Sequence, residues 1–145
     1  MNEIDRKIRP ICLDIKDPER ATMLSIITAS SCARIHIEDV EYLEQFGRKL
    51  DLMTGDLQYS VYDYLDNLVP YFKGTSFFRV MRGLLVNFDK VRNIDEDSIY
   101  FESGNVITLG RNNMCKTRNA FKKYLKEYPI YNPQELHLMV AEQNG

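Results

Sequence analysis

Two arginines interrupt an apolar segment in the middle of the chain, and their chemistry limits what can surround them. The segment FFRVMRGLLVN, residues 77–87, otherwise reads as a buried strand, with Arg79 and Arg82 three positions apart. A guanidinium is permanently charged and is costly to bury without a partner. Each arginine must therefore reach solvent, a carboxylate or an anionic ligand.

Basic residues are concentrated around this segment. The whole chain has a net charge of −2, whereas residues 71–126 contain eleven basic and five acidic side chains, a net charge of +6. A protein polarised in this way can present a basic face to phosphate while its acidic remainder keeps it soluble. A solvated basic helix near the C-terminus explains the same charge pattern equally well.

Other kinds of functional site have little support in the sequence. His36 and His137 lack the Ser, Cys or Asp spacing that is typical of a nucleophilic site, and NIDEDS lacks the ligand pattern of a calcium loop. Cys12, Cys32 and Cys115 are odd in number and widely spaced, which favours free thiols over a disulfide framework or a zinc site. We therefore expect no metal and no cofactor.

The composition is typical of one soluble domain. The chain has 145 residues, of which 44% are hydrophobic and 28% are charged. It contains no apolar run of the roughly 20 residues needed to cross a bilayer, and its N-terminus lacks the apolar region of a signal peptide. We expect a cytoplasmic location without membrane insertion.

Short strands with turns between them dominate the predicted secondary structure. β-branched and apolar residues favour strands over residues 23–30, 33–37 and 40–46. Two hairpins are expected, one around Gly55-Asp56 and one around Ser103-Gly104-Asn105, because both turns supply a residue that tolerates left-handed geometry.

Two helices are expected to pack on the sheet. Residues 61–72 carry apolar side chains at helical spacing, and Pro70 is expected to stop this helix. Residues 115–129 carry an apolar stripe, and Pro129 is expected to end the second helix. The stripes are Val61, Leu65 and Leu68 in the first helix, and Phe121, Tyr124 and Leu125 in the second. An edge strand near residues 10–20 and a terminal helix from residue 132 would complete the chain.

The order of these pieces resembles the LytTR DNA-binding domain, the output module of many bacterial response regulators. The resemblance covers about Met23 to Leu125, and its most specific parts are FFRV-R--LVN, the DSIYFESGN hairpin and the closing LGRN. It implies an elongated, mainly β fold of short antiparallel strands and hairpins with about two short helices. It also implies that loops enter successive major grooves of double-stranded DNA, and that the protein is not an enzyme.

The resemblance further implies which residues contact DNA. Arg79 and Arg82 match the basic positions before LVN, Gly47-Arg48-Lys49 matches a DNA-contacting loop between two strands, and Arg111 matches a major-groove reader. Arg82 is the better candidate for a base edge or its neighbouring phosphate, because its forked donors suit guanine or phosphate. The candidate set is Arg48, Lys49, Arg79, Arg82, Arg111, Asn112, Asn113 and Lys116.

Several of these residues also have structural interpretations. Arg79 or Arg82 could pair with an acidic side chain and tie strands together, the candidates being Glu41, Glu44 and Asp89. Asn112 or Asn113 could cap the following helix, whose N-terminus is itself a phosphate site. Lys116 would supply only non-specific attraction.

The chain differs from the family pattern at Met81-Arg82-Gly83, where the family often has His-Arg-Ser, so a titratable donor and a hydroxyl are lost from the central motif.

We expect an N-terminal extension over residues 1–22, a LytTR-like domain over 23–126 and a C-terminal extension over 127–145. The first extension is too short for a receiver domain. Control by a separate regulatory protein, by the extension or by oligomerisation is therefore expected, and family members bind repeated sites as two copies.

The competing hypothesis is an adaptor or inhibitor that acts by protein–protein interaction and does not bind DNA. Its interaction face would be the acidic strands, with Glu38, Asp39, Glu41 and Glu44. An adaptor has no reason to prefer one duplex over another, so a DNA-binding comparison separates the two hypotheses.

Overall fold

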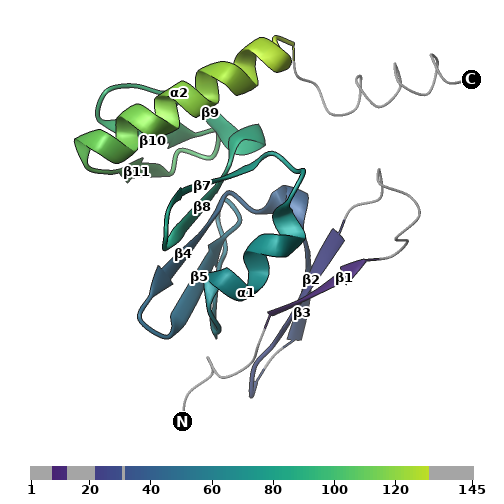
Figure 1. Ribbon diagram of the computed structural model, residues 1–145. Coiled ribbons are helices and arrows are strands. Elements are labelled where there is room, and N and C mark those ends of the chain that lie inside the picture. The colour runs from purple at the N-terminus through teal and green to yellow at the C-terminus, as the bar shows by residue number, and fades with distance from the viewer. Residues whose placement is uncertain (1–7, 13–21, 31, 131–145) are drawn as a thin grey trace, which may run out of the picture.

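A computed structural model describes residues 8–12, 22–30 and 32–130, and these residues form three antiparallel sheets (Figure 1). The N-terminal sheet has the order β1-β2-β3, with β1 at Ile8–Cys12, β2 at Thr22–Ile27 and β3 at Cys32–His36. The central sheet has the order β6-β5-β4-β8-β7, with β4 at Tyr42–Phe46, β5 at Lys49–Met53, β6 at Gln58–Tyr62, β7 at Phe77–Met81 and β8 at Leu84–Asn87. The third sheet has the order β11-β10-β9, with β9 at Val91–Ile94, β10 at Ser98–Phe101 and β11 at Val106–Thr108.

Two α-helices cover these sheets in the described part of the chain. The short helix α1, Leu65–Leu68, continues into the 3-10 helix η2, Val69–Phe72, and packs on the central sheet. The longer helix α2, Arg111–Glu127, lies on the third sheet (Figure 1). Two further 3-10 turns are η1, Ile37–Asp39, and η3, Phe88–Lys90. The predicted mainly β fold class with two helices is confirmed.

Strand β8 lies between two hydrophobic cores, and all four of its residues are buried. Leu85 belongs to the first core, which the central sheet shares with the N-terminal sheet and α1. Leu84 and Val86 belong to the second core, which includes residues of β10 and α2. Because successive side chains of a strand point to opposite faces, a strand between two cores is apolar at consecutive positions. This explains the uninterrupted apolar run at residues 84–86.

Asn87 ends β8 with a buried side chain that makes three hydrogen bonds. Its Nδ2 donates to the Val40 carbonyl at 2.9 Å, and its Oδ1 accepts from the Ser76 hydroxyl at 2.6 Å and the Asp89 amide at 3.0 Å. A buried amide whose partners are in place fixes the geometry of the segments around it. Asn87 therefore joins the segment before β4 to both ends of the β7–β8 hairpin.

The predicted strands and hairpins are confirmed in most places. The strand predictions at residues 23–30, 33–37 and 40–46 correspond to β2, β3 and β4. The two hairpins are β5–β6 and β10–β11, and Gly55 in the first turn has a φ of 90°, which explains the need for glycine. The expected edge strand overlaps β1, which pairs with β2.

The segment 77–87 is a hairpin, so its interpretation as one buried strand is wrong. Strands β7 and β8 pair antiparallel, and Arg82-Gly83 forms the turn between them. The register shifts between Arg79 and Met81, where β7 has a bulge. A bulge changes the direction in which the following side chains point.

The two helix predictions need correction at their boundaries. Val61 belongs to β6 and pairs with Leu50 of β5, because sheet pairing outweighs helical spacing at this position. Pro70 does not end a helix but lies in the first turn of η2. Helix α2 begins at Arg111, before the predicted start, and Leu125 is exposed although it was placed on the apolar stripe. The predicted helix from residue 132 lies outside the described residues.

Within the residues described, no helix has the length and apolar character that crossing a membrane requires.

Candidate nucleic-acid interface

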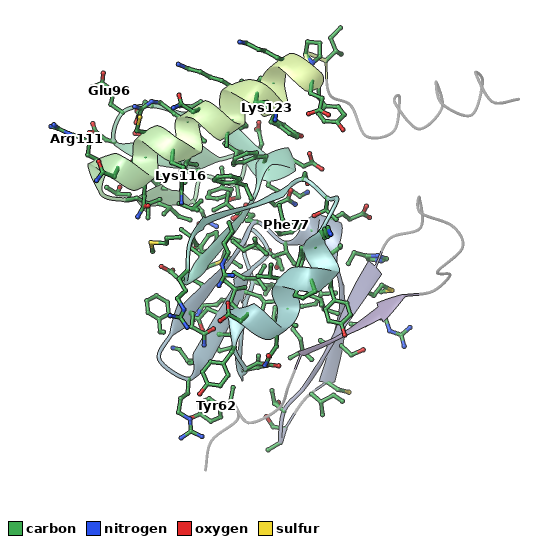
Figure 2. All side chains as sticks on the ribbon, viewed as in Figure 1. Tyr62, Phe77, Glu96, Arg111, Lys116 and Lys123 are labelled. Carbon is green, nitrogen blue, oxygen red and sulfur yellow. The ribbon has the colours of Figure 1, made fainter. Side chains whose placement is uncertain are left out.

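Three basic elements lie next to one another along one edge of the molecule. They are the β4–β5 turn with Arg48, the β7–β8 turn with Arg82, and the first turn of α2 with Arg111, and together we name them the basic edge (Figure 1). The backbone amide of Gln45 donates to the Gly83 carbonyl at 2.8 Å, which places the first two turns side by side. Figure 2 shows Arg111 at one end of this edge, and Tyr62, which lines a hollow with Arg48, at the other.

The β4–β5 turn presents Arg48 to solvent. Phe46 and Lys49 pair across a two-residue connection whose first residue, Gly47, has a φ of 60°. Glycine at this position is typical of a type II′ turn. The Arg48 side chain is exposed, whereas the Lys49 ammonium lies 5.9 Å from the Phe46 ring centroid and 3.8 Å from Asp51 Oδ1. Lys49 therefore shares its charge with its own strand, and Arg48 is directed outward.

In the β7–β8 turn the two arginines differ. The Arg79 guanidinium donates from Nη2 to Asp66 Oδ1 at 2.5 Å, and from Nη2 and Nε to the Arg82 carbonyl at 2.5 and 3.2 Å. The Arg82 side chain is 92% exposed, and its Nη2 lies 3.9 Å from Asp66 Oδ2. Arg79 thus stabilises the backbone of the turn, whereas the side chain of Arg82 is exposed to solvent.

The carboxylate that pairs with both arginines is on α1, and it is none of the three considered from sequence. The hydrogen bond from Arg79, together with the charge of that residue, lowers the pKa of Asp66 below its usual value. Asp66 therefore stays ionised beside both arginines at neutral pH. Glu41, one of the expected partners, is 3% exposed and accepts instead from Asn105 Nδ2 at 2.7 Å.

The first turn of α2 presents Arg111 and Asn112, which are both exposed. The N-cap residue is Gly110, which makes no side-chain capping bond, so the alternative in which Asn112 or Asn113 caps the helix is wrong. Asn113 Nδ2 donates to Met81 Sδ at 3.6 Å and so connects α2 to the β7–β8 hairpin. Lys116 is exposed one helical turn further along (Figure 2).

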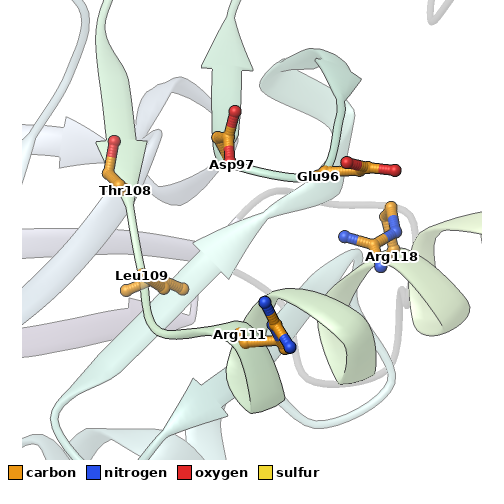
Figure 3. A pocket seen from close by; sticks show the side chains of 6 residues that line it. All are labelled: Glu96, Asp97, Thr108, Leu109, Arg111 and Arg118. Carbon is orange, nitrogen blue, oxygen red and sulfur yellow. The ribbon is translucent and has the colours of Figure 1, made fainter.

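A hollow of about 420 Å³ lies beside Arg111 and brings acidic side chains close to it. Arg111 and Arg118 extend from α2 on the side where Glu96 and Asp97 occupy the β9–β10 turn (Figure 3). Arg118 Nη1 donates to the Asp95 carbonyl at 3.2 Å. The Asp95 carboxylate accepts from the amides of Asp97 and Ser98, and these bonds lower its pKa. NIDEDS is therefore a hydrogen-bonded turn that places negative charge next to a candidate reader.

Asp66 and Gln45 support the turns of the basic edge, and sequence reasoning missed both. No sequence pattern points to Asp66, because it becomes a partner of Arg79 only through tertiary packing. A sequence pattern does point to Gln45. It follows Leu43 at alternate spacing on a strand, and so a polar side chain lies on the face that is otherwise buried in the first core.

The acidic face assigned to an adaptor is not continuous. Glu38 and Asp39 are exposed, but Glu41 is buried against Asn105, and burial raises the pKa of the half-buried Glu44, with the Asp51 charge adding to this effect. An interaction face built on all four carboxylates is therefore incorrect.

Comparisons with known proteins agree with the resemblance and with the fold. The family model described as the LytTr DNA-binding domain matches residues 30–127. A solved structure with a TM-score of 0.59 is the LytTr DNA-binding domain of a Bacillus cereus protein described as a methyl-accepting/DNA response regulator. It is 17% identical, and the likeness covers 69% of this chain and 95% of that one, which shows a common fold. A search of curated proteins finds no match. Since the family model spans most of the chain, this protein belongs to the LytTR family of DNA-binding, non-enzymatic domains.

Proposed function

We propose that this protein reads the sequence of double-stranded DNA through its basic edge and regulates transcription in this way. The observation that carries the proposal is the display of Arg48, Arg82 and Arg111 on three adjacent elements, outside both hydrophobic cores. Sequence is read by side chains that leave the core and reach base edges in a groove. The guanidinium fork suits this task because it can donate to guanine O6 and N7 together.

Within this proposal the basic residues have different roles. Arg82 and Arg111 are the base readers, because their side chains are exposed and lie at the tips of their elements. Phosphates are contacted by Arg48, Lys49 and Lys116, and by the backbone amides of the first turn of α2, where Asn112 lies. These phosphate contacts set the position of the domain on the duplex.

Arg79 and Asn113 have supporting roles in the proposal. Arg79 donates from Nε and Nη2 to the Arg82 carbonyl, and Asn113 donates from Nδ2 to the Met81 sulfur. Loops of the basic edge would enter major grooves of the duplex, and two copies on repeated sites would extend the contact. Regulation through a separate protein remains part of the proposal.

The proposal is tested with a site that the protein itself selects. The full chain is used to enrich a random duplex library, and the selected duplex is compared with a shuffled duplex of equal length and composition by fluorescence anisotropy at about 0.15 M salt. We expect the selected duplex to bind on the order of 10³-fold more tightly. The logarithm of the affinity should fall linearly with the logarithm of the salt concentration, because phosphate contacts release counterions.

Two outcomes would count against sequence reading. If the selected and shuffled duplexes bind equally well, the domain has only general affinity for DNA. If neither duplex is retained at low salt, the adaptor hypothesis becomes the better account of the chain.

A further inference from the structure

The side chain of Gln45 lies between the β4–β5 turn of the basic edge and the start of α1. Its Nε2 donates to the Asp63 carbonyl at 2.8 Å and to the Gly47 carbonyl at 3.0 Å, with the Lys49 carbonyl at 3.3 Å. Its Oε1 accepts from the Leu65 amide at 2.6 Å. One side chain thus bonds the inside of the β4–β5 turn and the start of α1.

The bond to Leu65 gives Gln45 a specific local task. The first amides of a helix have no partner within the helix and need an acceptor from elsewhere. Tyr64, the N-cap residue of α1, makes no side-chain capping bond. Gln45 supplies the acceptor from a neighbouring strand, and so it fixes the position of α1 relative to the β4–β5 turn.

Helix α1 then connects to the second turn of the basic edge. Asp66 follows Leu65 directly and accepts from Arg79 Nη2, and the same nitrogen donates to the Arg82 carbonyl at 2.5 Å. The backbone of Gln45 adds a second connection, through its bond to the Gly83 carbonyl. Arg48 and Arg82 are therefore displayed by two turns that share one hydrogen-bonded network.

We propose that Gln45 is a positioning residue for DNA reading, which sets the spacing between the Arg48 turn and the Arg82 turn. This inference rests on the proposed function. Non-specific binding depends mainly on charge, whereas reading bases requires each side chain to lie at a defined position relative to its neighbours. A network that holds two turns in one geometry before DNA arrives removes the ordering that binding would otherwise require. The loss of Gln45 should therefore reduce sequence preference more than general affinity.

The central variant is Gln45→Met, which keeps length and shape but cannot donate a hydrogen bond and is a poor acceptor. The readout is the specificity ratio, the affinity for the selected duplex divided by the affinity for the shuffled duplex. We expect this ratio to fall about tenfold, with the affinity for the shuffled duplex changing less than about twofold. A merely structural role would leave the ratio unchanged in the folded fraction.

Asn105→Ala provides a matched control at the other end of the central sheet. Asn105 Nδ2 bonds Glu41 Oε1 at 2.7 Å and the Gly55 carbonyl at 2.9 Å, so this variant also removes side-chain hydrogen bonds that join segments far apart in the sequence. It should lower the melting temperature and keep the specificity ratio of the parent. A Gln45→Met protein that also keeps the parental ratio would overturn the inference and leave the proposed function intact.

A second pair of variants decides the matter if Gln45→Met does not fold. Asp66 is exposed, so Asp66→Ala should fold, and it breaks the connection between α1 and Arg79. Asp66→Asn retains an acceptor for Arg79, and both variants remove the same charge. The inference requires a lower specificity ratio in Asp66→Ala than in Asp66→Asn. Equal ratios would overturn it, and a parent without any duplex preference would overturn both the inference and the proposed function.

Discussion

The exposed Arg82 and the engaged Arg79 should differ in how substitution by alanine changes the stability of the protein. Arg82→Ala removes a side chain that is 92% exposed and 3.9 Å from its nearest carboxylate. Exposed ion pairs at such distances contribute little to stability, so the melting temperature should stay within about 3 °C of the parent. The fold does not depend on this side chain.

The effect of Arg82→Ala on DNA should be much larger. A guanidinium that bonds a base through two donors contributes about 1–3 kcal/mol of discrimination, which is a factor of about 5 to 150 in Kd for the selected duplex. Arg79→Ala instead removes the bonds to the Arg82 carbonyl and to Asp66. Losing the support of the turn, about 1 kcal/mol, should lower the melting temperature by about 4–8 °C.

The assay pairs thermal unfolding by circular dichroism with an anisotropy titration on the selected duplex for each variant. Arg79→Lys is a useful third protein, because an ammonium retains the charge but cannot reproduce the fork that holds two acceptors. An Arg82→Ala protein that melts far below the parent, yet binds the selected duplex normally while folded, would refute this division of roles. It would show that Arg82 serves the fold.

Three further predictions concern other parts of the molecule. Arg111→Ala should weaken binding of the selected duplex by about 1–3 kcal/mol and relax preference at one or two base positions. Lys122 is an exposed basic residue of α2, and Lys122→Ala should weaken binding of selected and shuffled duplexes by similar factors and make the salt dependence shallower; titrations in which the two variants behave alike would contradict this. Asn87→Ala should cost about 3 kcal/mol in urea denaturation, since three hydrogen bonds are lost, and a loss below about 1 kcal/mol would show that the site relaxes. The pKa of Asp95 is lower in the folded protein than in the unfolded chain, where it is about 3.9. The ionised carboxylate therefore stabilises the protein at pH values above the unfolded-state pKa, and this contribution is lost as the pH falls through the folded-state pKa. The melting temperature of the parent should therefore decline relative to Asp95→Asn below about pH 4, and a pH-independent difference would exclude this role.

The strands and hairpins could be predicted because their signals are local. Alternating side chains and a turn residue such as Gly55 lie within a few positions of one another. The strands and the turn that these residues favour are also present in the paired sheet. The failure at residues 61–72 has the opposite origin. Val61 has helical spacing to Leu65, but its pairing with Leu50 places it in a strand, and this partner is visible only in the folded protein.

The candidate site was predictable in its residue types but not in the division of labour between them. Arg79 and Arg82 look alike in sequence, and what separates them is the bulge in β7 together with the position of Asp66 on α1. Gln45 shows the same limit, since its partners come from two turns and a helix. The residues that could touch DNA follow from the family resemblance, whereas the residues that orient them follow from tertiary contacts.

The position of β8 between two cores has a consequence for the motions of the molecule. Exposing the amides of Leu84, Leu85 and Val86 to solvent requires both cores to separate, so hydrogen exchange at these amides should occur only through global unfolding. The Arg82 turn ends at Gly83, directly before this strand. The anchor of the turn therefore stays folded during local fluctuations, and the geometry in which the network holds the Arg82 turn does not depend on them.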